Sequence, residues 1–168
     1  MNNVIPISKN QFSFEQIIID LTELCQQDLV SVNTILLDKL DSNVPLVHEV
    51  AKYLILSGGK RLRPLLTVSS YHMINSEIIK KENSINHIGL AAAVEFIHAA
   101  TLLHDDVIDE SKQRRGKPTA NEKWKNKTSV LVGDFLFSRA FQLMTKYGNS
   151  HTLKILADTS VIIQREKF

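Results

Sequence analysis

The sequence has one cysteine, no long apolar run and almost no excess of either charge. The single cysteine, Cys25, excludes an intramolecular disulfide and fits a reducing compartment, so we expect a cytoplasmic protein with Cys25 in its core. No apolar run approaches the roughly 20 residues that span a bilayer, and residues 1–11 lack the features of a signal peptide, so we expect no transmembrane segment. A net charge of +2 does not indicate nucleic-acid binding.

Strand signals are missing as well, because no segment alternates apolar and polar residues between hairpin turns. Apolar residues instead recur at helical spacing, which predicts an all-α bundle in one helical domain over residues 13–168. Capping residues and breakers set the expected boundaries, with Ser13, Thr128 and Ser150 as helix caps. We expect helices at 13–40, 45–56, 64–74, 84–108, 128–147 and 150–168, loops at 75–84 and 111–119, and a loose leader at 1–12.

The helix expected over residues 84–108 is apolar, yet it ends in a cluster of acidic residues. At about 100° per residue, His98, Asp105 and Asp109 fall within about 40° of one another, whereas Asp106 points about 100° away from Asp105. Asp105 and Asp109 are i,i+4 neighbours, and two such carboxylates favour a hard cation such as Mg²⁺. The alternatives are solvated charges at a helix end and, for His98, an ordinary core histidine.

Basic residues gather at two places in the sequence. Lys60, Arg61 and Arg63 precede an expected helix N-terminus, which is unfavourable for cations unless an anion binds there. The alternative is an ordinary basic surface after a glycine cap. A second basic run at residues 112–117 follows the acidic cluster directly. Carboxylates with a metal beside arginines are suited to a diphosphate substrate.

Four segments of the sequence resemble the trans-isoprenyl diphosphate synthases. They are Gly58–Pro64, Ile97–His98, Leu102–Asp109 and Arg114–Pro118, within a similarity that spans about Asp41 to Met144. The resemblance implies a helical bundle around a deep cavity. It also implies an Mg²⁺-dependent prenyltransferase that joins isopentenyl diphosphate head to tail with an allylic diphosphate and releases pyrophosphate.

The resemblance also implies roles for individual residues. Four basic side chains would hold isopentenyl diphosphate: Lys60, Arg63, His98 and Arg115. Asp105 and Asp109 would bind Mg²⁺ bridging the allylic diphosphate, and Arg114 would contact that diphosphate. These last three are the expected catalytic residues, because metal and guanidinium stabilise the departing pyrophosphate.

In the family that the sequence resembles, the residues four and five positions before the first aspartate help to set product length. Here they are Thr101 and Ala100, both small, which resembles long-chain, octaprenyl-type synthases that make quinone side chains. Helical geometry puts Thr101 one turn from Asp105 and about 40° away, whereas Ala100 is about 140° away. The helical wheel therefore explains Thr101 better than Ala100.

The sequence departs from that family in one respect, because nothing after Asp109 resembles the second aspartate-rich motif of its members. We therefore expect a truncated N-terminal half whose apolar faces are covered by a partner, either a second copy or a missing C-terminal half. The alternative function is an inactive remnant, or one subunit of a split or heteromeric synthase. A metal-dependent phosphohydrolase would need further histidine and aspartate ligands, which the sequence does not offer.

Overall fold

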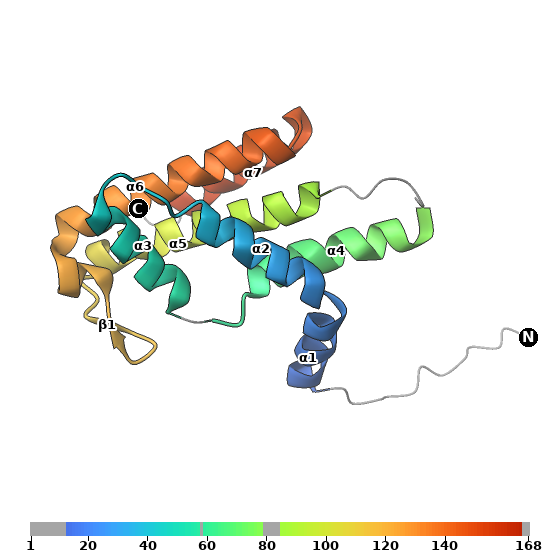
Figure 1. The fold of residues 1–168 in the computed structure, drawn as a ribbon, viewed down its shortest axis with the longest axis horizontal. Helices are drawn as coiled ribbons and strands as arrows, with labels where there is room; N and C mark the ends of the chain where they lie inside the picture. The colour runs from blue at the N-terminus through green and yellow to red at the C-terminus, as the bar shows by residue number, and fades with distance from the viewer. Residues whose placement is uncertain (1–12, 58, 79–84, 166–168) are drawn as a thin grey trace, which may run out of the picture.

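The computed structural model describes residues 13–57, 59–78 and 85–165, and within them it contains seven helices and one short hairpin (Figure 1). The all-α class is confirmed, while the leader expected over residues 1–12 lies outside the described residues. The elements are α1 (Phe14–Leu24), α2 (Gln26–Asp38), α3 (Pro45–Leu56), α4 (Leu62–Ile78), α5 (Asn86–Ile108), β1 (Gln113–Arg114), β2 (Lys117–Pro118), α6 (Ala120–Tyr147) and α7 (Ser150–Arg165).

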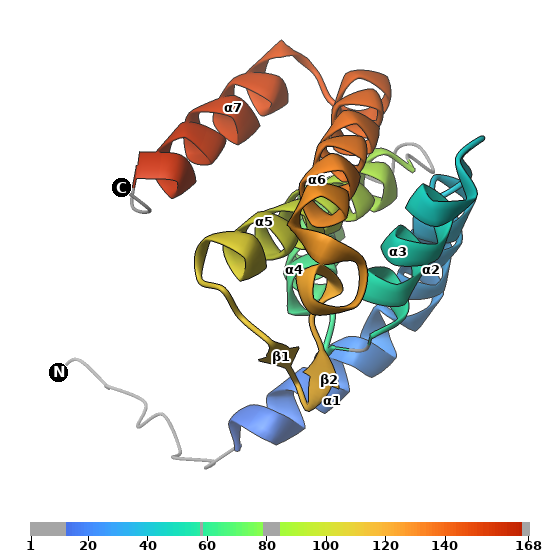
Figure 2. The ribbon, with the colours of Figure 1, turned by 90° about the vertical axis from the view of Figure 1, so that its left-hand side faces the viewer.

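Helix α5 is the centre of the bundle. It packs most extensively against α6 and also against α4 and α2, and α3 packs on α6. Figure 2 shows α7 on the opposite side of α5 and α6 from α2 and α3. Small side chains let the neighbouring helices approach α5 closely, and its buried alanines are Ala91, Ala92, Ala93, Ala99 and Ala100.

Helix α5 is apolar enough to be tested against the expectation that the chain has no transmembrane segment. Its 23 residues meet the length and hydropathy of a spanning helix, with a mean hydropathy of 1.2 in the most apolar window. Half of that window is buried inside the bundle. The core helix of a soluble protein has the same properties, so this helix is weak evidence for a membrane span.

The first expected helix is two helices. It begins as predicted, because the Ser13 hydroxyl accepts a hydrogen bond from the Gln16 N–H at 3.1 Å. It breaks at Cys25, whose backbone angles of −97° and 9° separate α1 from α2. Cys25 is 4% exposed, which confirms its place in the core. Helical periodicity alone does not reveal a one-residue break of this kind.

The expected loop at 111–119 contains an antiparallel hairpin, in which Gln113 pairs with Pro118 and Arg114 with Lys117. Its two turn residues, Arg115 and Gly116, both have positive φ (53° and 74°), as a type I′ turn requires. Strands of two residues are too short to leave an alternating pattern in the sequence. The hairpin connects the end of α5 to the start of α6 (Figure 2).

Three other boundaries differ from the prediction. Helix α6 begins at Ala120 rather than near Thr128, and a non-helical residue, Lys125 (φ 71°), kinks it. Helix α4 extends to Ile78, into the expected connection at 75–84, the rest of which lies outside the described residues. Helix α7 does begin at Ser150, but its capping side chain belongs to Asn149, whose Oδ1 accepts the Thr152 N–H at 2.9 Å.

Candidate functional site

The acidic end of α5 presents two carboxylates on one edge of the helix. Asp105 is half-buried, and Asp109 is the exposed C-terminal cap, whose N–H donates to the Asp105 carbonyl at 2.8 Å. Their i,i+4 spacing brings the two Cβ atoms to about 5–6 Å. The two aspartates predicted to bind a metal therefore lie one turn apart at the end of the helix, and they offer the oxygen donors that Mg²⁺ prefers.

Asp106 faces the other way, as the helical wheel predicts. It is 2% exposed and binds the Arg114 guanidinium, with Oδ1 2.8 Å from Nη2 and 3.0 Å from Nε. Arg114 comes from β1, so this ion pair anchors the hairpin to α5. Arg114 was expected to contact a diphosphate, and no partner was expected for Asp106. In this structure two of the guanidinium nitrogen atoms are occupied by Asp106.

The basic residues expected to bind isopentenyl diphosphate surround one pocket of about 420 Å³. They come from three parts of the chain: the segment before and at the start of α4, the middle of α5, and the turn of the hairpin. Its lining residues are Gly59, Lys60, Arg61, Leu62, Arg63, Glu95, His98 and Arg115. The structure thus brings together the four basic side chains that the resemblance had grouped.

Arg61 organises the segment that carries Lys60 and Arg63. Its guanidinium donates from Nη1 to Glu95 Oε1 and from Nη2 to the Ile55 carbonyl at 2.7 Å. Arg61 therefore ties the end of α3 and the start of α4 to the side of α5. Arg61 was expected among the anion-binding cations, whereas its hydrogen bonds to Glu95 and Ile55 give it a positioning role.

Gly59 allows Arg115 to approach this segment. Its φ of 155° falls in the range that side chains rarely adopt, and a Cβ there would collide with the Arg115 guanidinium. The hairpin turn can therefore lie directly over the segment before α4. No signal for this contact is present in the sequence, because the two residues are 56 positions apart.

His98 is half-buried among these cations. Burial, the largest cause, and then the positive charge of Arg63 lower the pKa of His98, and Arg115 and Arg114 act in the same direction, while Glu95 opposes them. The imidazole is therefore neutral at pH 7 and adds no repulsion to the pocket. An arriving anion would offset the positive field and favour the protonated ring.

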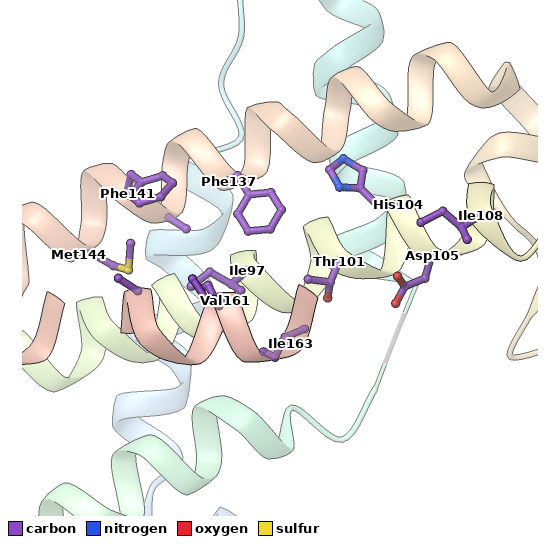
Figure 3. Close-up of a pocket in the computed structure, with 13 residues that line it drawn as sticks. Ile97, Thr101, His104, Asp105, Ile108, Phe137, Phe141, Met144, Val161 and Ile163 are labelled. Carbon is purple, nitrogen blue, oxygen red and sulfur yellow. The ribbon is translucent and has the colours of Figure 1, made fainter. Parts of the chain in front are cut away.

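Asp105 lies at the edge of a second, apolar cavity of about 510 Å³ between α5, α6 and α7. Along α5 the cavity follows one ridge of i,i+4 residues: Ile97, Thr101 and Asp105. Figure 3 shows the Asp105 carboxylate near Thr101, with Phe137, Phe141 and Met144 of α6 extending along the far wall. From α7 the lining residues are Ala157, Ser160, Val161 and Ile163.

The two small residues expected to set product length lie in different places. Thr101 lines it, one turn from Asp105, while Ala100 is fully buried in the core and is not among its lining residues. The sequence analysis did not identify the aromatic wall. Phe137, Phe141 and Met144 recur at i,i+4 and i+3 spacing on α6, and this helical spacing is the signal in the sequence that indicates a shared face.

Comparisons with known proteins identify one family. The model of the polyprenyl synthetase family matches residues 44–167. The chain is 43% identical to the octaprenyl diphosphate synthase of Escherichia coli (strain K12) over 143 residues, which are 85% of this chain and 42% of that protein. It is 35% identical to heptaprenyl diphosphate synthase component 2 of Geobacillus stearothermophilus, over 82% of this chain and 41% of that protein.

Solved structures give the same result. A polyprenyl synthase from Caulobacter crescentus CB15, complexed with calcium and isoprenyl diphosphate, is 44% identical and superimposes with a TM-score of 0.83 over 89% of this chain and 44% of that one. A decaprenyl diphosphate synthase from Rhodobacter capsulatus is 47% identical, with a TM-score of 0.81 over 89% and 45%. The chain spans about two fifths of the length of the curated relatives described here.

Proposed function

The chain belongs to the polyprenyl synthetase family, and from that premise we propose that it binds the two substrates of a long-chain prenyl diphosphate synthase. In the proposed reaction, the double bond of isopentenyl diphosphate attacks the allylic carbon as pyrophosphate leaves, and a proton is then lost from the new chain. The chain spans about two fifths of the length of its relatives. The residues of this chain therefore support substrate binding, which is the first part of the proposal.

The observation that carries the proposal is the convergence of basic side chains on one pocket. Lys60, Arg63 and Arg115 are exposed cations that surround the half-buried His98, and they come from segments far apart in the sequence. Basic side chains that share one pocket favour the binding of an anion, and the acidic residue that also lines it, Glu95, is bound to Arg61. Guanidinium groups bind phosphate oxygens in pairs, and a diphosphate offers enough oxygens for several of these residues.

The second part of the proposal assigns the allylic diphosphate to the acidic edge of α5. Asp105 and Asp109 would hold Mg²⁺, and their oxygen donors at i,i+4 spacing fit this ion. The ion would supply charge neutralisation for the departing pyrophosphate. Arg114, five residues after Asp109, would help to neutralise the pyrophosphate. Its guanidinium would first have to break one of its hydrogen bonds to Asp106.

The third part assigns the apolar cavity to the growing prenyl chain. A hydrocarbon tail would extend from Asp105 past Thr101 and Ile97, along the wall that Phe137 and Phe141 form. Such a wall excludes water, which would otherwise quench an allylic cation. Names of the relatives, octaprenyl and decaprenyl synthases, support a long product. Ala100 stays a prediction as a length determinant, since it lies in the packed core.

Calorimetry with isopentenyl diphosphate tests the basic pocket directly. We expect Lys60→Ala and Arg63→Ala each to weaken binding by about tenfold, equivalent to about 1.4 kcal/mol. Lys127→Ala is the matched control, because Lys127 is an exposed lysine on α6 outside the pocket. Equal affinity of Lys60→Ala, Arg63→Ala and the control would contradict the assignment.

Prenyl transfer from farnesyl diphosphate to isopentenyl diphosphate, with and without Mg²⁺, tests the complete reaction. Binding together with Mg²⁺-dependent elongation, measured over a range of protein concentrations, would support a self-sufficient synthase. Binding without elongation would support a subunit that needs further chain, and the relatives named heptaprenyl diphosphate synthase component 2 favour that second candidate.

A further inference from the structure

Three side chains from three helices meet at the end of α5 that is remote from the acidic edge. Asp28 of α2 lies 2.6 Å (Oδ2) from His72 Nε2 of α4 and 3.1 Å from His87 Nε2 of α5. Within the described residues, these three form a group whose ligand atoms all lie within 4.8 Å of one another. His87 and Asp105 are eighteen residues apart on α5, which puts this group about 27 Å from the proposed Mg²⁺ site at Asp105.

The chemistry of the group is that of a transition-metal site. Two imidazole nitrogens and one carboxylate oxygen are common ligands of Zn²⁺, at about 2.0–2.2 Å from the ion. Without an ion, both Nε2 atoms must carry protons to donate to the same oxygen of Asp28. An ion placed between the three atoms would replace those protons and require shifts of only about 1 Å, given the ligand distances above.

We propose that Asp28, His72 and His87 form a binding site for a divalent transition metal such as Zn²⁺, with water completing its coordination. The bound ion joins α2, α4 and α5, so it stabilises the half of the bundle that lies away from the substrate pockets. The proposal does not depend on the prenyltransferase reaction.

The surroundings of the group support a built site with one open side. His87 is 9% exposed, and its ring stacks on Tyr71 with a centroid distance of 3.8 Å and an angle of 1° between planes. This stacking fixes the direction of the ring. The His72 side chain is 53% exposed, which leaves room for it to adjust and for water to reach the ion. Preorganised ligands of this kind lower the cost of binding.

Calorimetry with Zn²⁺ on chelator-treated, Mg²⁺-free protein tests the proposal. The background is the Asp105→Asn/Asp109→Asn variant, which removes the other carboxylate pair. We expect one Zn²⁺ per chain, and at least a tenfold loss of affinity in His72→Ala. The matched control is His151→Ala, an exposed histidine of α7, which should bind as the background does.

A second variant separates metal binding from a merely structural hydrogen bond. His72→Gln keeps an N–H donor for Asp28 but is a poor ligand for Zn²⁺. We expect His72→Gln to melt like the background without metal and to lose the rise in Tm that Zn²⁺ gives the background. With Co²⁺, the background should show the visible absorption of a tetrahedral site. Absence of saturable Zn²⁺ binding, or unchanged affinity in both His72 variants, would overturn the proposal.

Discussion

Replacing Arg114 by alanine should destabilise the fold more than replacing its partner Asp106. Without Arg114, a carboxyl group that is 2% exposed loses the guanidinium that it binds. Removing one partner of a buried pair costs about 3–5 kcal/mol, because an uncompensated charge stays in the interior. Since the Arg114 side chain is 37% exposed and its site admits some water, the lower end of that range, about 3 kcal/mol, is expected.

The reciprocal change has a smaller expected cost. In Asp106→Ala, the partly exposed guanidinium of Arg114 can turn to water, so only the charged hydrogen bonds are lost, at about 1–2 kcal/mol. The double variant removes both charges and should resemble Asp106→Ala. The double variant is therefore expected to be about 1–2 kcal/mol more stable than Arg114→Ala alone, which is a coupling that additive effects do not produce.

Urea unfolding followed by circular dichroism measures all three free energies of unfolding. A cost of 1 kcal/mol corresponds to about 2–4 °C in Tm for a chain of this size. The control is Lys154→Ala, because the Lys154–Asp158 pair is exposed (73% and 62%) and should contribute only about 0.3–0.5 kcal/mol. The reasoning is refuted if Arg114→Ala costs no more than Asp106→Ala, or if the two single costs add in the double variant.

Three further outcomes are expected. Gly59→Ala should weaken isopentenyl diphosphate binding about tenfold in calorimetry, because its Cβ displaces Arg115, whereas Lys127→Ala, outside the pocket, should leave affinity unchanged. The depressed pKa of His98 means that the unfolded chain binds the proton more readily, so urea unfolding should show stability falling below pH 6.5, less so in His98→Asn. Thr101→Phe should weaken Mg²⁺-dependent binding of farnesyl diphosphate more than of dimethylallyl diphosphate, because it fills the cavity beside the diphosphate.

Local chemistry was enough to predict most helices and one edge of the site. Ser13 and Pro45 begin helices because a capping hydroxyl and a fixed φ act within one turn. Asp105 and Thr101 share a cavity because residues four apart lie on one side of any α-helix. Such features depend on neighbours in the sequence and do not require the rest of the fold.

Features that depend on contacts between distant segments were not predictable in the same way. The Asp106–Arg114 pair requires the hairpin to fold back on α5, and a hairpin of two-residue strands leaves no periodic signal. The Asp28, His72 and His87 group requires three helices to be docked in a particular register. In the sequence, each of these histidines is isolated, and nothing distinguishes it from a histidine at the surface.

The placement of His98 shows why the helical wheel was incomplete and how the two pockets are related. The wheel puts His98 on the same face as Asp105, but seven residues also separate them by about 10.5 Å along the axis. The ridge through Ile97, Thr101 and Asp105 lines the apolar cavity, and the next ridge, through His98, Leu102 and Asp106, lines the basic side. Because neighbouring ridges of one helix cannot slide past each other, α5 would fix the distance between the diphosphate proposed at His98 and the prenyl chain proposed to extend past Thr101.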